Sequence, residues 1–185
     1  MKTIVRETKE TRVEIGLARA GATPARAGVT VETGEPFLDH MLATLGFYAG
    51  VELVVKAKGD LKHHLMEDVA ITLGEAVAGI VPARARRYGE RTLPMDDALV
   101  QVALDLGGRP YYAGQLPSAL YDHWFRSFAM QSRATLHVRV LHGTDRHHVV
   151  EAAFKALGLS LAQALEESWP LFSTKGAVTW SEGSC

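Results

Sequence analysis

Alternation of hydrophobic and polar residues marks several short stretches of the chain and predicts strands with one buried face. Val13, Ile15 and Leu17 share one face of such a stretch, while Arg12 and Glu14 lie on the other. The same alternation recurs in the second half of the chain, so we expect matching strands in both halves. The predicted strands lie at residues 11–17, 51–57, 100–104 and 136–140, with further strands near 28–33 and 109–115.

Apolar residues at intervals of three or four positions predict two long helices and two short ones. One long apolar stripe covers residues 150–165 and the other covers residues 66–81. We expect the short helices to begin after Pro36 and at Leu120, where a few apolar residues follow at helical spacing. Each long helix follows the second predicted strand of its half.

The two halves of the chain therefore show the same order of elements, namely strand, short helix, strand and long helix. This repeat predicts an internal duplication within one domain that covers residues 1–185. We place the repeats at about residues 1–92 and 93–178, followed by a short C-terminal tail. Amphipathic elements bury their apolar faces against one another, so we expect an α+β fold with two mixed sheets and a helical layer between them.

Composition narrows the classes of protein to which the chain can belong. Of 185 residues, 47% are hydrophobic and 22% are charged, and the formal net charge is −1, as in an ordinary soluble globular domain. The near-neutral charge argues against nucleic-acid binding, and the lack of an apolar run of about 18 residues argues against a membrane span. No signal-peptide pattern is present and the single cysteine, Cys185, allows no internal disulfide, so we expect a cytoplasmic protein.

Six of the eight histidines fall into a pattern that occurs once in each half. A His-His pair opens each long predicted helix, with a glutamate one turn later on the same edge, and a third histidine follows an aspartate in each short helix. A single histidine at a helix start is ordinarily a solvated or capping residue, but packing alone does not explain the complete duplicated set. The candidate metal ligands are His40, His63, His64, Glu67, His123, His147, His148 and Glu151.

The chemistry of these side chains indicates a divalent transition metal. Imidazole and carboxylate groups are the usual ligands of Mn²⁺, Fe²⁺, Zn²⁺ and Ni²⁺, and the lack of cysteine ligands disfavours a closed structural zinc site. Side chains of adjacent helical residues diverge by about 100°, so the two histidines of one pair cannot easily bind the same ion. We therefore expect two metals, each of which draws ligands from both halves or from another subunit.

Other polar residues are weaker candidates when each is considered alone. Glu10 precedes the first strand, as Asp96 does in the second half, but a plain surface charge would look the same. The segment Ser173-Thr174-Lys175-Gly176 suits a phosphate, although such residues are common in any loop. Arg87 and Arg109 are equally consistent with a solvated helix end and a turn.

Taken together, the motifs resemble the imidazoleglycerol-phosphate dehydratase family. The similarity runs from about residue 6 to residue 178, with the motifs in the family's order. One difference is Thr44, which stands where the family has a glutamine that contacts the phosphate end of the substrate. The matching segments are Lys9-Glu10-Thr11, Pro36-Phe37-Leu38-Asp39-His40-Met41-Leu42, His63-His64-x-x-Glu67-Asp68, Arg87-Tyr88-Gly89, Pro94-Met95-Asp96, Leu104-Asp105-Leu106, Gly108-Arg109-Pro110, Thr135-Leu136-His137, His147-His148-x-x-Glu151-Ala152 and Ser173-Thr174-Lys175-Gly176.

The resemblance implies the sixth step of histidine biosynthesis, the dehydration of D-erythro-imidazole glycerol phosphate to imidazole acetol phosphate. It also implies two Mn²⁺ ions per active site, held by the residues that match the candidate ligands, on a fold like domain 2 of ribosomal protein S5. Members of the family build a closed homo-oligomer of about 24 subunits from trimers, with active sites between subunits.

A mechanism consistent with this activity begins with the imidazole of the substrate, which two metals would stabilise as an imidazolate. The imidazolate expels the C3 hydroxyl to give a diazafulvene, and loss of the C2 proton then gives an enol that becomes the ketone. Glu10 is the candidate acid–base residue for these proton transfers. The remaining candidates are Arg87, Arg109, Ser173 and Lys175 for the phosphate and Asp96 for a substrate hydroxyl.

Two other classes of protein use similar residues. A dinuclear phosphoesterase would employ the same ligands and basic residues, and it would release inorganic phosphate from its substrate. A metal-storage protein is disfavoured, because ferritin-like sites place Glu-x-x-His on long bundle helices, whereas the order here is His-x-x-Glu with strands between the helices.

Overall fold

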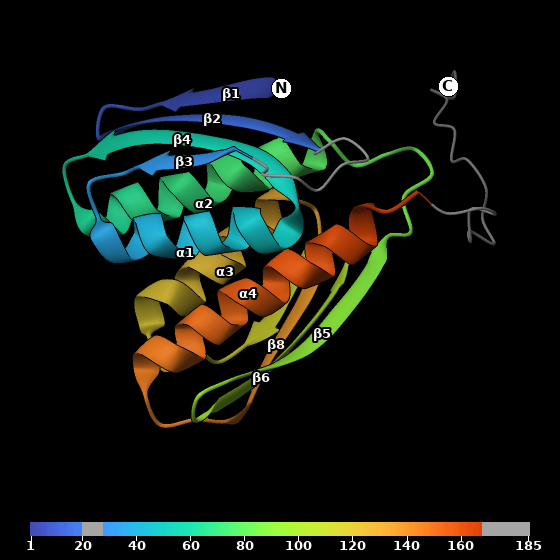
Figure 1. The fold of residues 1–185 in the computed structure, drawn as a ribbon. Helices are drawn as coiled ribbons and strands as arrows, with labels where there is room; N and C mark the ends of the chain where they lie inside the picture. Colours follow the sequence, from blue (N-terminus) through green and yellow to red (C-terminus); the bar gives the residue numbers. More distant parts are fainter. Residues whose placement is uncertain (20–27, 168–185) are drawn as a thin grey trace, which may run out of the picture.

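Two four-stranded mixed sheets form the outer layers of the computed structural model, which describes residues 1–19 and 28–167 (Figure 1). The strands are β1 (Lys2–Glu7), β2 (Thr11–Arg19), β3 (Val29–Glu32), β4 (Val51–Gly59), β5 (Tyr88–Met95), β6 (Ala98–Asp105), β7 (Tyr111–Gly114) and β8 (Thr135–His142). The first sheet has the order β1-β2-β4-β3 and the second has the order β5-β6-β8-β7. In each sheet the first three strands of that order pair antiparallel and the last pairs parallel. The predicted α+β class with two similar half-domains is confirmed.

Four helices fill the space between the two sheets in the described part of the chain (Figure 1). They are α1 (Pro36–Ala49), α2 (Lys62–Ala78), α3 (Ala119–Gln131) and α4 (Arg146–Leu165). Helices α1 and α2 cover the first sheet, and α3 and α4 cover the second. Across the middle of the molecule, α2 packs on α3 and α4 packs on α1. The long helix of each half therefore contacts the short helix of the other half.

Glycines at corresponding positions of the two long helices permit these crossings. A Cβ atom on Gly74 would lie 2.8 Å from the carbonyl oxygen of Phe128, which is on α3. A Cβ atom on Gly158 would lie equally close, 2.8 Å, to the carbonyl oxygen of Leu45 on α1. Because carbon and oxygen atoms cannot approach so closely without a shift, the backbones of each helix pair meet only where the long helix has no side chain.

The sequence pattern did not predict the edge strands β1 and β5. Few of their side chains are buried, and β5 contains Arg91, Thr92 and Pro94, so neither strand shows the alternation that identified the others. Since β5 begins at Tyr88 and pairs with β6, the division predicted between residues 92 and 93 falls inside a strand of the second sheet. None of the helices in the described residues is long and apolar enough to cross a membrane.

Candidate metal centre

The first turn of α2 and the start of α3 bring two histidines and a glutamate together. His63 and Glu67 lie one turn apart on α2, with 3.8 Å between Nε2 and Oε2. His123 approaches from α3, with its Nε2 3.3 Å from Oε1 of Glu67, and its ring stacks on that of His63 at a centroid distance of 5.1 Å. The three potential ligand atoms lie within 4.8 Å of one another. We call these three residues the α2–α3 cluster.

A corresponding group lies at the start of α4. His147 and Glu151 are again one turn apart, with 3.1 Å between Nε2 and Oε2. His40 of α1 places its Nε2 3.4 Å from the same Oε2. Asp145 caps the helix by accepting a hydrogen bond of 2.7 Å from the backbone N–H of His147. We call His40, His147 and Glu151 the α1–α4 cluster.

Each cluster thus combines the long helix of one half with the short helix of the other. The sequence predicted that a metal would draw on both halves or on another subunit, and the helix crossings bring both halves together within one chain. Binding of a metal by these residues stays a prediction. The donor set suits one, since Nε2 of His123 is buried and makes no hydrogen bond among the described residues. A buried nitrogen without a hydrogen bond is costly unless it binds a ligand such as a metal ion.

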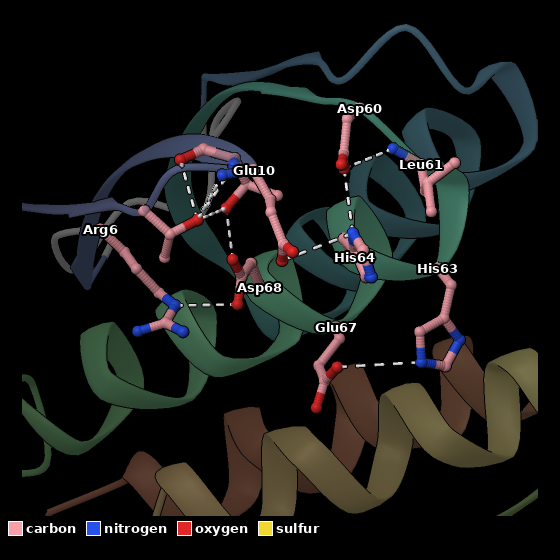
Figure 2. A network of polar contacts seen from close by, with 10 residues as sticks. Arg6, Glu10, Asp60, Leu61, His63, His64, Glu67 and Asp68 are labelled. Atoms are coloured by element: carbon pink, nitrogen blue, oxygen red, sulfur yellow. Dashed lines mark hydrogen bonds and ion pairs between the residues drawn. The ribbon is translucent and has the colours of Figure 1, made fainter.

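The second histidine of each pair points away from the cluster on its own helix. In Figure 2, Glu10 and Asp60 both point toward His64, while His63 and Glu67 face each other elsewhere on α2. Nδ1 of His64 lies 3.0 Å from Oδ1 of Asp60 and 3.5 Å from Oε2 of Glu10. The hydrogen bond with Asp60 raises the pKa of His64 and lowers the pKa of Asp60.

His148 has an equivalent environment in the second half. Its Nδ1 lies 2.8 Å from Oδ1 of Asp97, and its Nε2 lies 3.5 Å from Oδ2 of Asp96. Asp97 also accepts hydrogen bonds from the backbone N–H groups of Thr144 and Asp145. These bonds and the one with His148 hold the pKa of Asp97 well below its usual range, and the bond with Asp97 raises the pKa of His148.

Asp60 and Asp97 are site residues that the sequence interpretation missed. Each lies in a turn near a residue that the patterns did identify. Asp60 lies between the end of β4 and the first His-His pair, and Asp97 directly follows Asp96. For Asp60 the signal was an acid three residues before the first pair, whereas Asp97 lies in the turn between β5 and β6, far from the second pair in the sequence. The contacts of both aspartates with the histidines are seen only in the folded structure, where the turns lie next to the helices.

The turn that carries Glu10 is fastened to α2 by a network of polar contacts (Figure 2). Oγ1 of Thr8 accepts hydrogen bonds from the backbone N–H groups of Glu10 and Thr11, at 3.1 and 3.0 Å. The hydroxyl of Thr11 donates to Asp68, which also accepts a bond of 2.9 Å from Nε of Arg6. The position of Glu10 is therefore tied to the helix that carries His63 and His64.

The residues expected to bind phosphate are not joined to the clusters by any hydrogen bond or ion pair in residues 1–19 and 28–167. Arg87 donates two hydrogen bonds, of 3.0 and 2.9 Å, to the carboxylate of Asp105. Arg109 is exposed in the turn before β7. Thr44 is buried on α1. Ser173 and Lys175 lie outside the described residues.

Comparisons with known proteins identify the family to which the chain is similar. A family model described as imidazoleglycerol-phosphate dehydratase matches residues 33–161. A Pyrobaculum aerophilum protein named imidazoleglycerol-phosphate dehydratase is 44% identical to this chain over 94% of it and 98% of its own length. A Dictyoglomus thermophilum protein of the same name is 41% identical over 95% and 97%.

Solved structures give the same result. A crystal structure of IGPD from Pyrococcus furiosus in complex with (S)-C348 has a TM-score of 0.82 at 38% identity, covering 95% of this chain and 100% of that one. The structure of imidazoleglycerol-phosphate dehydratase from Staphylococcus aureus has a TM-score of 0.77 at 28% identity, covering 91% and 100%. With the family model and near-complete relatives in agreement, the chain belongs to the imidazoleglycerol-phosphate dehydratase family.

Proposed function

We propose that this hydro-lyase catalyses the Mn²⁺-dependent dehydration of D-erythro-imidazole glycerol phosphate to imidazole acetol phosphate, the sixth step of histidine biosynthesis. Family membership supports the dehydratase activity. The observation that supports the metal is the pair of equivalent clusters, each with two imidazoles and one carboxylate facing one another. Mixed nitrogen and oxygen donors without thiolates suit Mn²⁺.

Two Mn²⁺ ions per active site would be held by the eight residues of the repeated pattern. The six cluster residues supply part of each shell, and the second histidine of each pair supplies a further donor. When bound, the metal supplies Lewis acidity toward the imidazole ring of the substrate. The ligands would be His40, His63, His64, Glu67, His123, His147, His148 and Glu151.

Glu10 is positioned to move the protons of the reaction. Dehydration removes the C2 proton and the C3 hydroxyl as water and leaves an enol that tautomerises to the ketone. The carboxylate of Glu10 lies on a turn that Thr8 shapes, and its Oε2 is 3.5 Å from His64. A carboxylate next to the ligand sphere can accept the C2 proton and return one to the departing hydroxyl.

The phosphate would be held by charge-assisted hydrogen bonds from Arg109, Ser173 and Lys175, with Arg87 joining them while it stays paired with Asp105. Asp96, which is exposed beside His148, would accept a hydrogen bond from a substrate hydroxyl. Fixing both ends of the substrate in this way would align the reacting carbon atoms with Glu10.

We further propose a cytoplasmic homo-oligomer, built from trimers, of about 24 subunits with closed symmetry. The orientation of His64 and His148 supports active sites between subunits. Both histidines point away from the clusters of their own chain and toward acidic residues, so we propose that each joins a metal held together with a neighbouring subunit.

The proposal is tested by turnover of imidazole glycerol phosphate by metal-stripped protein, before and after addition of Mn²⁺. We expect the ketone product only with Mn²⁺ and without release of inorganic phosphate. Release of phosphate would identify the rival phosphoesterase activity. A protein that is fully loaded with Mn²⁺ and yields neither product would contradict the proposal.

A further inference from the structure

The two clusters differ at the position one helical turn after their glutamate. In α4 this position is Lys155, four residues beyond Glu151, whereas in α2 it is Ile71, four residues beyond Glu67. Residues four apart on a helix are neighbours on its surface, so each side chain stands beside its glutamate. The duplication is therefore symmetric in the ligands but not in the charge next to them.

The ammonium group of Lys155 is held in place from several sides. Its Nζ lies 2.9 Å from Oε1 of Glu151 and 3.4 Å from Sδ of Met95 on β5. The same atom lies 6.0 Å from the ring centre of Tyr48 on α1. The side chain of Lys155 is only 19% exposed. Solvent therefore screens this charge less than it screens a surface lysine.

Lys155 also determines which oxygen of Glu151 faces the cluster. Since Oε1 is bound to the ammonium, Oε2 alone lies near both His40 and His147. Among residues 1–19 and 28–167, Glu67 has no such cation, and it turns one oxygen toward His63 and the other toward His123. Burial by itself would raise the pKa of Glu151, but the hydrogen bond and charge of Lys155, with His40, lower it overall.

We propose that Lys155 makes the two metal sites unequal, so that the α1–α4 cluster holds Mn²⁺ through a single oxygen of Glu151 and more weakly than the α2–α3 cluster. This inference rests on the metal binding in the proposed function. The physical reason is that a fixed ammonium neutralises much of the carboxylate charge that attracts the ion and also repels the ion directly. A half-loaded state, with the α2–α3 cluster filled first, then exists during loading.

The test is a Mn²⁺ titration of the metal-stripped, full-length protein, in which electron paramagnetic resonance measures free Mn²⁺ and calorimetry measures bound Mn²⁺. For the wild type we expect two classes of site in equal number, with dissociation constants that differ roughly tenfold or more. Lys155→Met removes the charge and keeps the length of the side chain, so the weaker class should tighten and approach the other. Lys155→Gln, which keeps an N–H donor for Glu151, should have the same effect.

Ile71→Lys is the matched control, because it places an ammonium one turn after Glu67 and should weaken the tighter class. Circular dichroism and sedimentation establish that each variant folds and assembles. A single affinity in the wild type, or an unchanged gap in both Lys155 variants, would overturn the inference. Loss of the weaker class of site in Lys155→Met, with its retention in Lys155→Gln, would also overturn the inference. Lys155 would then act only by holding the carboxylate of Glu151 in place. Failure of the wild type to bind Mn²⁺ at all would instead contradict the proposed function on which the inference rests.

Discussion

Glu10 differs from the two cluster glutamates in where the backbone places it. Glu67 and Glu151 lie on the first turns of long helices, beside histidines of the same helix. Glu10 lies on a turn between two strands, and its side chain is 57% exposed. A helix fixes a carboxylate at a ligand position, whereas an exposed turn leaves it accessible to a substrate. The two kinds of glutamate therefore suit metal binding and proton transfer respectively.

Replacement of Glu10 by glutamine should lower kcat by about 100-fold or more, the usual contribution of a general acid–base residue. KM and the number of bound Mn²⁺ ions should stay close to the wild-type values, because the backbone of the turn is held by Thr8 and not by the Glu10 carboxylate. Steady-state kinetics and metal analysis of the same preparation check both statements. If Glu10→Gln instead loses metal, then Glu10 joins Asp60 and His64 as a ligand, a grouping that the geometry also permits.

The contact between His148 and Asp97 should make the stability of the metal-free protein depend on pH. The pKa of His148 in the fold is raised above 6.5, so the contact stabilises the protein fully at pH values below 6.5. That stabilisation is lost as the pH rises through the raised value. Chemical denaturation of metal-stripped protein across this range should show the loss, and Asp97→Asn should reduce it, because Asp97 makes the largest contribution to the raised pKa. A His148 resonance that titrates at 6.5 or below in the wild type would rule the effect out.

At the scale of helices and strands, the crossings at Gly74 and Gly158 determine which histidine joins which cluster. Gly158→Ala would force apart the backbones of α1 and α4, and Gly74→Ala those of α2 and α3. Each substitution should lower the free energy of unfolding by about 1–3 kcal/mol, the usual cost of overpacking. Denaturant unfolding measures this cost.

The two glycine variants also serve as controls for each other. Gly158→Ala should weaken Mn²⁺ binding at the α1–α4 cluster and leave the other cluster unchanged, while Gly74→Ala should do the reverse. Equal weakening of both sites in either variant would mean that the crossings do not act locally. A Mn²⁺ titration that resolves the two sites distinguishes these results.

The sequence predicted most elements because their apolar residues recur at a regular spacing, as in β2 and α4. It also identified every member of both clusters, since a spacing of four residues on a helix is a local property and His40 and His123 follow an aspartate in both halves. It could not assign His123 to Glu67 or His40 to Glu151, because these pairs depend on how helices cross. Asp97 was missed for the same reason, because its partner His148 lies on α4. Asp60 and Lys155 lie only four residues from His64 and Glu151, but the sequence patterns were searched for ligands and not for charged groups beside them.

At the scale of the whole molecule, metal binding and assembly should be coupled. Mn²⁺ ions that take ligands from two subunits would link trimers, so removal of metal should convert the assembly of about 24 subunits into trimers. Analytical ultracentrifugation before and after chelation, and again after Mn²⁺ is restored, measures this conversion. His148→Ala should prevent reassembly while the trimer remains. An assembly that keeps its mass without metal would show that protein contacts alone hold it together.

The contact of each long helix with the short helix of the other half has a consequence for the origin of the chain. If both halves descend from one ancestral unit, that unit had a His-His-x-x-Glu helix and a histidine helix, each of which packed against the other helix of a second copy. Two copies were then needed to form a complete cluster, with the short helix of each lying against the long helix of the other. On that condition the ancestor would have been a two-fold dimer, and duplication and fusion of its gene would have allowed the two copies to diverge, so that a lysine stands beside only one glutamate.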